Sequence, residues 1–146
     1  MIIIGSDHAG CKLKEFIKDY LGEIGEQYAD MGTNSEESCD YPIFAEKTAK
    51  KVANTENAKG ILVCGSGIGV SIAANKVHGI RAALCMNEEL AEMSRRHNDA
   101  NILCLGARYT DLETAKNIIR IFFSTEFEGG RHERRVQEIK DIEQNN

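Results

Sequence analysis

The sequence has no apolar run of the length needed to cross a membrane, and it has no excess of basic residues. Its net charge is −5. A general nucleic-acid binder needs clustered Lys and Arg to contact phosphates, so this class is disfavoured. The N-terminal segment MIIIGSDHAG lacks a basic stretch before its apolar residues and reaches Asp7 at once, which is not typical of a secretory signal. We therefore expect no membrane and no nucleic acid among the partners.

A disulfide framework and a CxxC zinc site are also missing. The five cysteines stand far apart, at positions 11, 39, 64, 85 and 104, and their number is odd. This usage favours a reduced, cytoplasmic compartment. There is no internal repeat and no low-complexity tract. A chain of 146 residues with 42% hydrophobic residues suits one domain, residues 1–146, with a core of its own.

Hydrophobic periodicity predicts alternating strands and helices. The expected strands are 1–5, 27–31, 61–64, 80–85 and 102–105, and the expected helices are 13–24, 42–55, 68–77, 87–97, a segment starting at 110, and 131–144. Pro42 should open the second helix, and TDLE at 110–113 has the pattern of a capping box. This alternation predicts a doubly wound α/β fold: a five-stranded parallel sheet in the order 2-1-3-4-5, with helices on both faces and a C-terminal helix.

The segment GILVCGSGIGVSIAANK (60–76) places Cys64 where a buried strand passes into a glycine-rich turn and then a helix. Backbone N–H groups at such a helix start can hold a phosphate or a developing oxyanion, and they favour the thiolate form of a cysteine. The alternative is a tight turn that needs glycine, with a cysteine that only packs. The loop is not a dinucleotide fingerprint, because Val70 stands where the third glycine belongs, and no Walker A Lys follows.

Other polar residues gather near the predicted carboxyl ends of the strands. Asp7 and His8 follow the first strand, which the predicted order places beside the third at the switch point. His97 stands between a helix and the last strand, where it could instead cap the helix. Arg131 and Arg135 are four residues apart on one helix face, so they can converge on one anion or form part of a charged surface helix.

In combination, the motifs SDHAG, DYP, CGSGIGVSIAANK, GIRA, HNDANIL and GGRHERRV strongly resemble those of the sugar-phosphate isomerase family that contains type B ribose-5-phosphate isomerases and galactose-6-phosphate isomerase subunits. The resemblance runs from residue 1 to about residue 140. It implies an aldose–ketose isomerase that interconverts ribose 5-phosphate and ribulose 5-phosphate, a step of the pentose phosphate pathway, without metal or cofactor.

The resemblance also implies roles for individual residues. Cys64 matches the base that moves a proton between C1 and C2, and His97, helped by Asp7, matches the acid/base that opens the sugar ring. The hydroxyl of Ser66, which replaces the family's usual threonine, would serve the sugar oxygens. The residues that match substrate-binding positions are His8, Tyr41, Gly65, Gly67, Ile68, Gly69, Asn98, Arg108, Arg131 and Arg135.

Three further expectations concern substrate and assembly. The smaller Ser66 could admit a six-carbon sugar such as allose 6-phosphate, and galactose 6-phosphate is a further alternative. A non-catalytic sugar-phosphate sensor on the same fold is the alternative from another class. Finally, the C-terminal helix carries an apolar seam of Val136, Ile139 and Ile142, so we expect a homodimer with shared active sites, or a dimer of such dimers.

Overall fold

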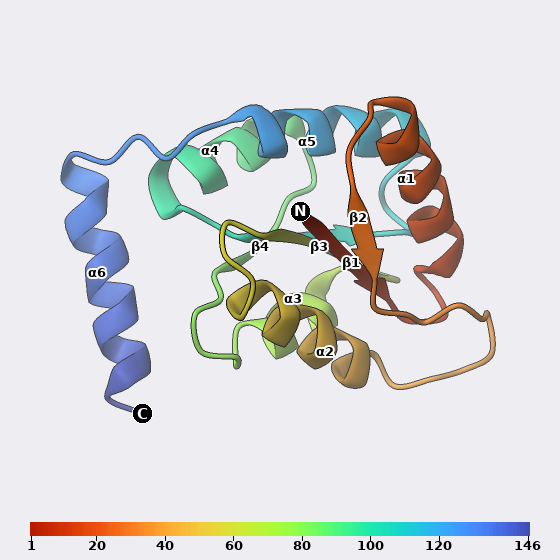
Figure 1. The fold of residues 1–146 in the computed structure, drawn as a ribbon, viewed down its shortest axis with the longest axis horizontal. Coiled ribbons are helices and arrows are strands. Elements are labelled where there is room, and N and C mark those ends of the chain that lie inside the picture. Colours follow the sequence, from red (N-terminus) through yellow and green to blue (C-terminus); the bar gives the residue numbers. More distant parts are fainter.

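A computed structural model describes residues 1–146 and contains a five-stranded parallel sheet (Figure 1). The strands are β1 (Ile2–Ser6), β2 (Tyr28–Asp30), β3 (Lys59–Cys64), β4 (Ala82–Leu84) and β5 (Ile102–Gly106). The helices are α1 (Cys11–Glu23), α2 (Tyr41–Ala53), α3 (Ile68–Ala74), α4 (Glu88–Asn98), α5 (Leu112–Ser124) and α6 (Arg131–Gln144). The predicted α/β fold class and the C-terminal helix are thus confirmed.

The strand order is β2-β1-β3-β5-β4, so the last two strands exchange places relative to the predicted order. All five residues of β5 are buried, whereas the three residues of β4 are only half-buried. The apolar run ILCL can be covered on both faces and flanked by strands on both sides, and the short alanine-rich β4 is suited to an edge. The neighbours β1 and β3, which position the site, are as predicted, with Ser6 opposite Val63.

Helices cover both faces of the sheet and form two separate cores (Figure 1). α1, α4 and α5 pack on one face, where Ile61 and Val63 of β3 point. α2 and α3 pack on the other face, where Leu62 and Cys64 point. This division follows from the alternation of side chains along a strand, and it places the Cys64 thiol on the side of α2 and α3.

Two helix starts differ in how well the sequence predicted them. Pro42 lies in the first turn of α2, as expected, where its missing N–H leaves no hydrogen bond unmade. The N-cap of α5 is Asp111, whose carboxylate accepts the N–H of Thr114 at 2.8 Å, and not Thr110. Thr110 is buried, and its hydroxyl has no hydrogen-bond partner. The N-cap therefore lies one residue after the predicted one, and the predicted capping box of Thr110 and Glu113 does not form.

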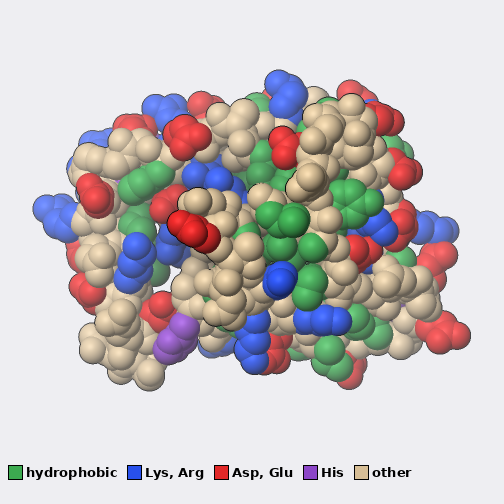
Figure 2. Space-filling model, in the orientation of Figure 1, with side chains coloured by type: hydrophobic (Ala, Val, Ile, Leu, Met, Phe, Trp, Pro, Cys, Tyr) green, Lys and Arg blue, Asp and Glu red, His purple; other side chains and the backbone are tan.

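The last helix, α6, stands apart from the layered body at the left of Figure 1. Ile139 and Ile142 on this helix are 43% and 64% exposed. A groove of about 770 Å³ separates α6 from the segment around β4, and the space-filling view shows the gap (Figure 2). On the face drawn there, acidic and basic side chains are interspersed, without a large patch of one sign.

Candidate active site

A pocket of about 410 Å³ opens at the carboxyl ends of β1 and β3. Parallel sheets bind ligands at this edge, beside the point where strand connections diverge. Nine of the predicted site residues line it, together with Ala9 and Ile72: Asp7, His8, Tyr41, Cys64, Gly65, Ser66, Ile68, Gly69 and Arg108. One chain therefore brings most of the predicted site together.

Cys64 ends β3 at the floor of this region and is 5% exposed. Its Sγ accepts a hydrogen bond from the backbone N–H of Gly67 at 3.1 Å. Gly67 has φ +80°, a left-handed conformation that favours glycine, and this turn directs the N–H back toward the sulfur. The backbone therefore places a hydrogen-bond donor against the Cys64 sulfur.

The other cysteines have different surroundings. Burial raises the pKa of Cys11, Cys85 and Cys104, so these thiols stay protonated. The backbone of Cys39 contacts the candidate site, because its N–H donates to Nδ1 of His8 at 3.2 Å.

The glycine loop presents only some of its N–H groups to the pocket. The N–H of Gly67 is used by Cys64, and that of Ile68 donates to Ser66 Oγ at 3.2 Å. The N–H groups of Gly65, Ser66 and Gly69 have no acceptor within the chain. Of the loop residues 65–69 that are predicted to bind substrate, these three therefore keep a backbone N–H free to donate to an oxyanion. Ser66 Oγ accepts from Ile68 and keeps its own hydrogen free to donate.

Asp7 and His8 are both held by backbone donors. The carboxylate of Asp7, 5% exposed, accepts the N–H of Gly10 at 3.0 Å, which fixes it at the start of α1. Because His8 Nδ1 accepts the N–H of Cys39, the ring proton of the neutral imidazole lies on Nε2. An Nε2–H donor is suited to a phosphate oxygen.

Two glycines of the loop make room for neighbouring side chains. A Cβ on Gly65 would lie 3.0 Å from Nη1 of Arg108, and one on Gly69 would lie 2.5 Å from the ring of Tyr41. The Arg108 backbone N–H also donates to the carbonyl of Gly65 at 3.0 Å. The missing side chains thus allow a guanidinium and an aromatic ring to rest directly on the loop.

A buried lysine anchors the start of the segment that connects β2 to α2. Lys14 is fully buried, and its Nζ donates to Asp30 at 2.6 Å, to the carbonyl of Thr33 at 2.5 Å and to Asn34 at 3.2 Å. Burial alone would raise the pKa of Asp30, but hydrogen bonds from Lys14 and Lys18 outweigh it and lower that pKa below its usual range. The sequence analysis did not single out this buried pair.

Five predicted site residues do not line the pocket: Gly67, which lies within the glycine loop itself, and His97, Asn98, Arg131 and Arg135. His97 and Asn98 end α4, and the two arginines occupy the first two turns of α6, where both are exposed. Asn98 lines the groove beside α6. Within one chain, the two groups predicted to act on the sugar, Cys64 and His97, therefore do not share a pocket.

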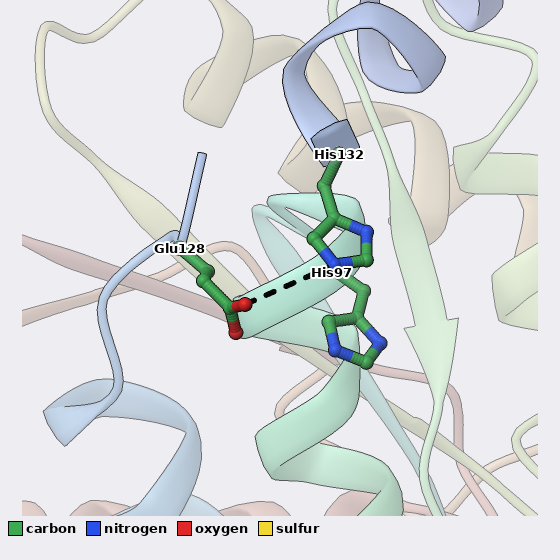
Figure 3. A group of neighbouring side chains, drawn as sticks. All are labelled: His97, Glu128 and His132. Carbon is green, nitrogen blue, oxygen red and sulfur yellow. Dashed lines mark ion pairs between the residues drawn. The ribbon is translucent and has the colours of Figure 1, made fainter. Parts of the chain in front are cut away.

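His97 instead belongs to a cluster with Glu128 and His132 (Figure 3). The imidazoles of His97 and His132 stack with ring centres 4.1 Å apart and planes 13° apart. Burial lowers the pKa of His132, and the charges of His97 and Arg131 act in the same direction. The sequence analysis missed Glu128 and His132. The signal available in the sequence was the spacing of four residues between Glu128 and His132, which come after a helix that ends in His97 and Asn98.

No helix of this structure combines the length and the apolar character that a bilayer crossing requires. The sequence profile of the family described as Ribose/Galactose Isomerase matches residues 2–139. This chain belongs to that family. The resemblance carried by the SDHAG, CGSGIGVSIAANK and GGRHERRV motifs is thereby confirmed.

Individual relatives are similar over almost their whole length. Ribose-5-phosphate isomerase B of Escherichia coli (strain K12) is 48% identical over 143 residues, which cover 98% of this chain and 96% of the relative. The solved ribose-5-phosphate isomerase B of Clostridium thermocellum is 51% identical with a TM-score of 0.97, covering 99% and 97%. That of Mycoplasma genitalium, solved with bound ribulose 5-phosphate, is 41% identical with a TM-score of 0.95, covering 99% and 97%.

Proposed function

We propose that this member of the Ribose/Galactose Isomerase family is an enzyme that interconverts ribose 5-phosphate and ribulose 5-phosphate. The observation that carries this proposal is that one pocket holds a thiol beside free N–H donors and, on its wall, His8 and Arg108. The thiol and the N–H donors are suited to proton transfer beside a carbonyl, and His8 and Arg108 are suited to bind a phosphate. The Mycoplasma genitalium relative, with ribulose 5-phosphate bound, supports this choice of substrate.

In the proposed chemistry, Cys64 is the base. As a thiolate it removes the proton from C2 of the open-chain aldose, and the electron pair of the broken C–H bond moves into the C1–C2 bond to form an enediolate. The N–H groups of Gly65, Ser66 and Gly69 bind the developing oxyanion. The proton of the C2 hydroxyl moves to the oxygen at C1, the Cys64 thiol returns its proton to C1, and the C2 oxygen becomes the carbonyl of the ketose.

The sugar ring must open before this proton transfer. We assign this step to His97, which moves a proton between the ring oxygen and the hydroxyl at C1, assisted by Asp7 in the pocket. The Ser66 hydroxyl, free to donate, and the Asn98 amide bind sugar hydroxyls, and Tyr41 closes the pocket wall. No step requires a metal or cofactor.

We propose that contacts to the phosphate group position the sugar in the site. Arg108 and His8 approach it from the pocket wall, and Arg131 and Arg135 would complete the site from α6. Guanidinium groups can grip a phosphate with two parallel hydrogen bonds each. Binding energy from this unreactive end can orient C1 and C2 against Cys64.

We further propose a homodimer in which each site combines two chains. His97, Asn98, Arg131 and Arg135 lie outside their own chain's pocket, yet the proposed reaction needs them beside Cys64. The projecting α6 with its exposed Ile139 and Ile142, and the groove next to it, are suited to contact a second copy. The proposal treats residues 1–146 as one isomerase domain that acts in the cytoplasm.

The test is an isomerisation assay on ribose 5-phosphate, allose 6-phosphate and galactose 6-phosphate. We expect ketose formation with the highest kcat/KM for ribose 5-phosphate. A higher kcat/KM for either six-carbon sugar would favour that substrate. Binding of all three sugars without any ketose would indicate a sensor and contradict the proposal.

A further inference from the structure

The cluster of His97, Glu128 and His132 combines the ligand types of a transition-metal site (Figure 3). It joins the last turn of α4, the segment before α6 and the first turn of α6. One nitrogen or oxygen from each side chain lies within 4.8 Å of the others. In Figure 3 the carboxylate of Glu128 and the ring of His132 point toward each other beside the ring of His97.

The strongest sign of a missing ligand is Nε2 of His132. His132 is 5% exposed, and this nitrogen is buried without a hydrogen-bond partner. The carboxylate atom Glu128 Oε1 lies 4.0 Å from it, which is beyond hydrogen-bond distance. A buried imidazole nitrogen normally has a partner, so a cation between these two atoms would satisfy both.

Glu128 is already positioned for such a role by Arg96. The guanidinium of Arg96 contacts Glu128 Oε2 at 3.0 and 3.1 Å, and the backbone N–H of Glu128 donates to the carbonyl of Arg96 at 3.1 Å. These contacts use only one carboxylate oxygen and leave Oε1 facing His132. Second-shell contacts of this kind orient metal ligands in known sites.

We propose that His97, Glu128 and His132 bind a divalent transition-metal ion, with Zn²⁺ as the representative ion. Zn²⁺ takes imidazole nitrogen and carboxylate oxygen at about 2.0–2.2 Å in a tetrahedron, so its ligand atoms lie about 3.4 Å apart. The rings of His97 and His132 stack with planes 13° apart, so one imidazole must rotate for both nitrogens to point at one ion, and a water would take the fourth position. Two nitrogen ligands make Mg²⁺ and Ca²⁺ poor candidates.

The ion would be an inhibitor and not a cofactor. Arg96 pairs with Glu128, and the charges of Arg131 and Arg135 act on His132, so these three cations oppose a bound metal ion and favour reversible binding. An ion bound to a nitrogen of His97 would hinder the proton exchange with the sugar ring that we assign to this residue. This consequence for turnover rests on the proposed function, whereas metal binding itself does not.

Binding is tested with the whole protein, stripped of metal with a chelator and titrated calorimetrically with ZnCl₂. We expect saturation at one ion per chain. Loss of a supporting second-shell group costs about 10–100-fold in metal affinity, so loss of a ligand in Glu128→Gln should weaken binding at least about 100-fold. Glu126→Gln, an exposed carboxylate on the same segment, and His78→Gln are matched controls and should bind as the wild type does.

Cobalt absorption separates this cluster from the cysteines, because thiolate ligands give Co²⁺ an intense near-ultraviolet band that imidazole and carboxylate lack. We expect Co²⁺ bound without that band. A thiolate band that disappears in Cys64→Ala, or equal Zn²⁺ affinity in Glu128→Gln and Glu126→Gln, would overturn the site. Zn²⁺ binding by a protein without isomerase activity would contradict only the proposed function, and isomerase activity without Zn²⁺ binding would contradict only the metal site.

Discussion

The backbone N–H of Gly67 donates a hydrogen bond of 3.1 Å to Sγ of Cys64, joining the end of β3 to the start of α3. This contact fixes the position that a Cys64 thiolate would occupy. It also uses one loop N–H for the proposed base and leaves those of Gly65, Ser66 and Gly69 free for an enediolate. The proposed base and oxyanion donors therefore come from one stretch of six residues, 64–69.

Replacing Cys64 with alanine should abolish proton transfer. We expect kcat to fall at least ~10²-fold, because a positioned base typically contributes that much or more. Ribose 5-phosphate should still bind, since the phosphate ligands are unchanged. Cys85→Ala, a buried cysteine in the other core, should keep its kcat. A Cys64→Ala enzyme with near-normal turnover would remove Cys64 from the mechanism.

Arg131 and Arg135 should govern binding of the phosphate. Either change to alanine should raise KM for ribose 5-phosphate by roughly 10- to 100-fold, the loss of one hydrogen bond to a charged group. Unphosphorylated ribose should be affected much less. Arg134→Ala is the matched control, because Arg134 pairs with Glu138 and its side chain is 76% exposed. Equal losses with both sugars would indicate a structural role for the two arginines.

Gly65→Ala tests whether Arg108 binds the substrate from its position against Gly65. The new Cβ would lie 3.0 Å from Nη1 and 3.1 Å from Cζ of Arg108, and the flexible guanidinium would move away. We expect a raised KM for ribose 5-phosphate with no loss of thermal stability. Gly22→Ala, where no atom lies within 4 Å of the added Cβ, should leave KM unchanged. An unaltered KM in Gly65→Ala would show that Arg108 does not bind the substrate there.

Asp30→Asn should destabilise the fold by about 3–5 kcal/mol, because it leaves the fully buried Lys14 without its counter-charge. Denaturant unfolding measures this. Glu15→Gln removes the more exposed partner of Lys18 and should cost less than about 1 kcal/mol.

The Lys14–Asp30 pair also predicts that the free energy of unfolding depends on pH. The folded-state pKa of Asp30 lies below its ordinary value of 3.8, so the stabilisation is present above that pH and is lost as pH falls through the folded-state pKa. The stability difference between wild type and Asp30→Asn should therefore shrink below about pH 4. A difference that stays constant down to pH 2 would mean that ionisation of Asp30 is not involved.

The sequence predicted the part of the site that depends on β1 and β3. Both strands are clear apolar runs, and the residues that follow them, Asp7, His8 and the loop after Cys64, must meet when the strands are neighbours. The order of the last two strands was wrong because periodicity does not state which strand is at an edge. The half-buried, alanine-rich β4 was the signal for an edge strand.

The residues that sequence analysis missed depend on contacts between distant segments. In the sequence, Lys14 looks like an ordinary charged residue of an amphipathic helix. It becomes buried against Asp30 and Thr33 only because the chain after β2 folds over it. Likewise, nothing in the sequence brings the end of α4 to the start of α6, where His97 stacks on His132.

The central claim is that Cys64 of one chain and His97 of another form each active site, and complementation tests it most directly. Cys64→Ala and His97→Ala are prepared separately, each inactive, and then unfolded and refolded together in equal amounts. Random pairing makes about half of the dimers mixed, and each mixed dimer has one intact site, so roughly a quarter of the sites should recover activity. Mixed dimers that form but show no activity would contradict the shared site.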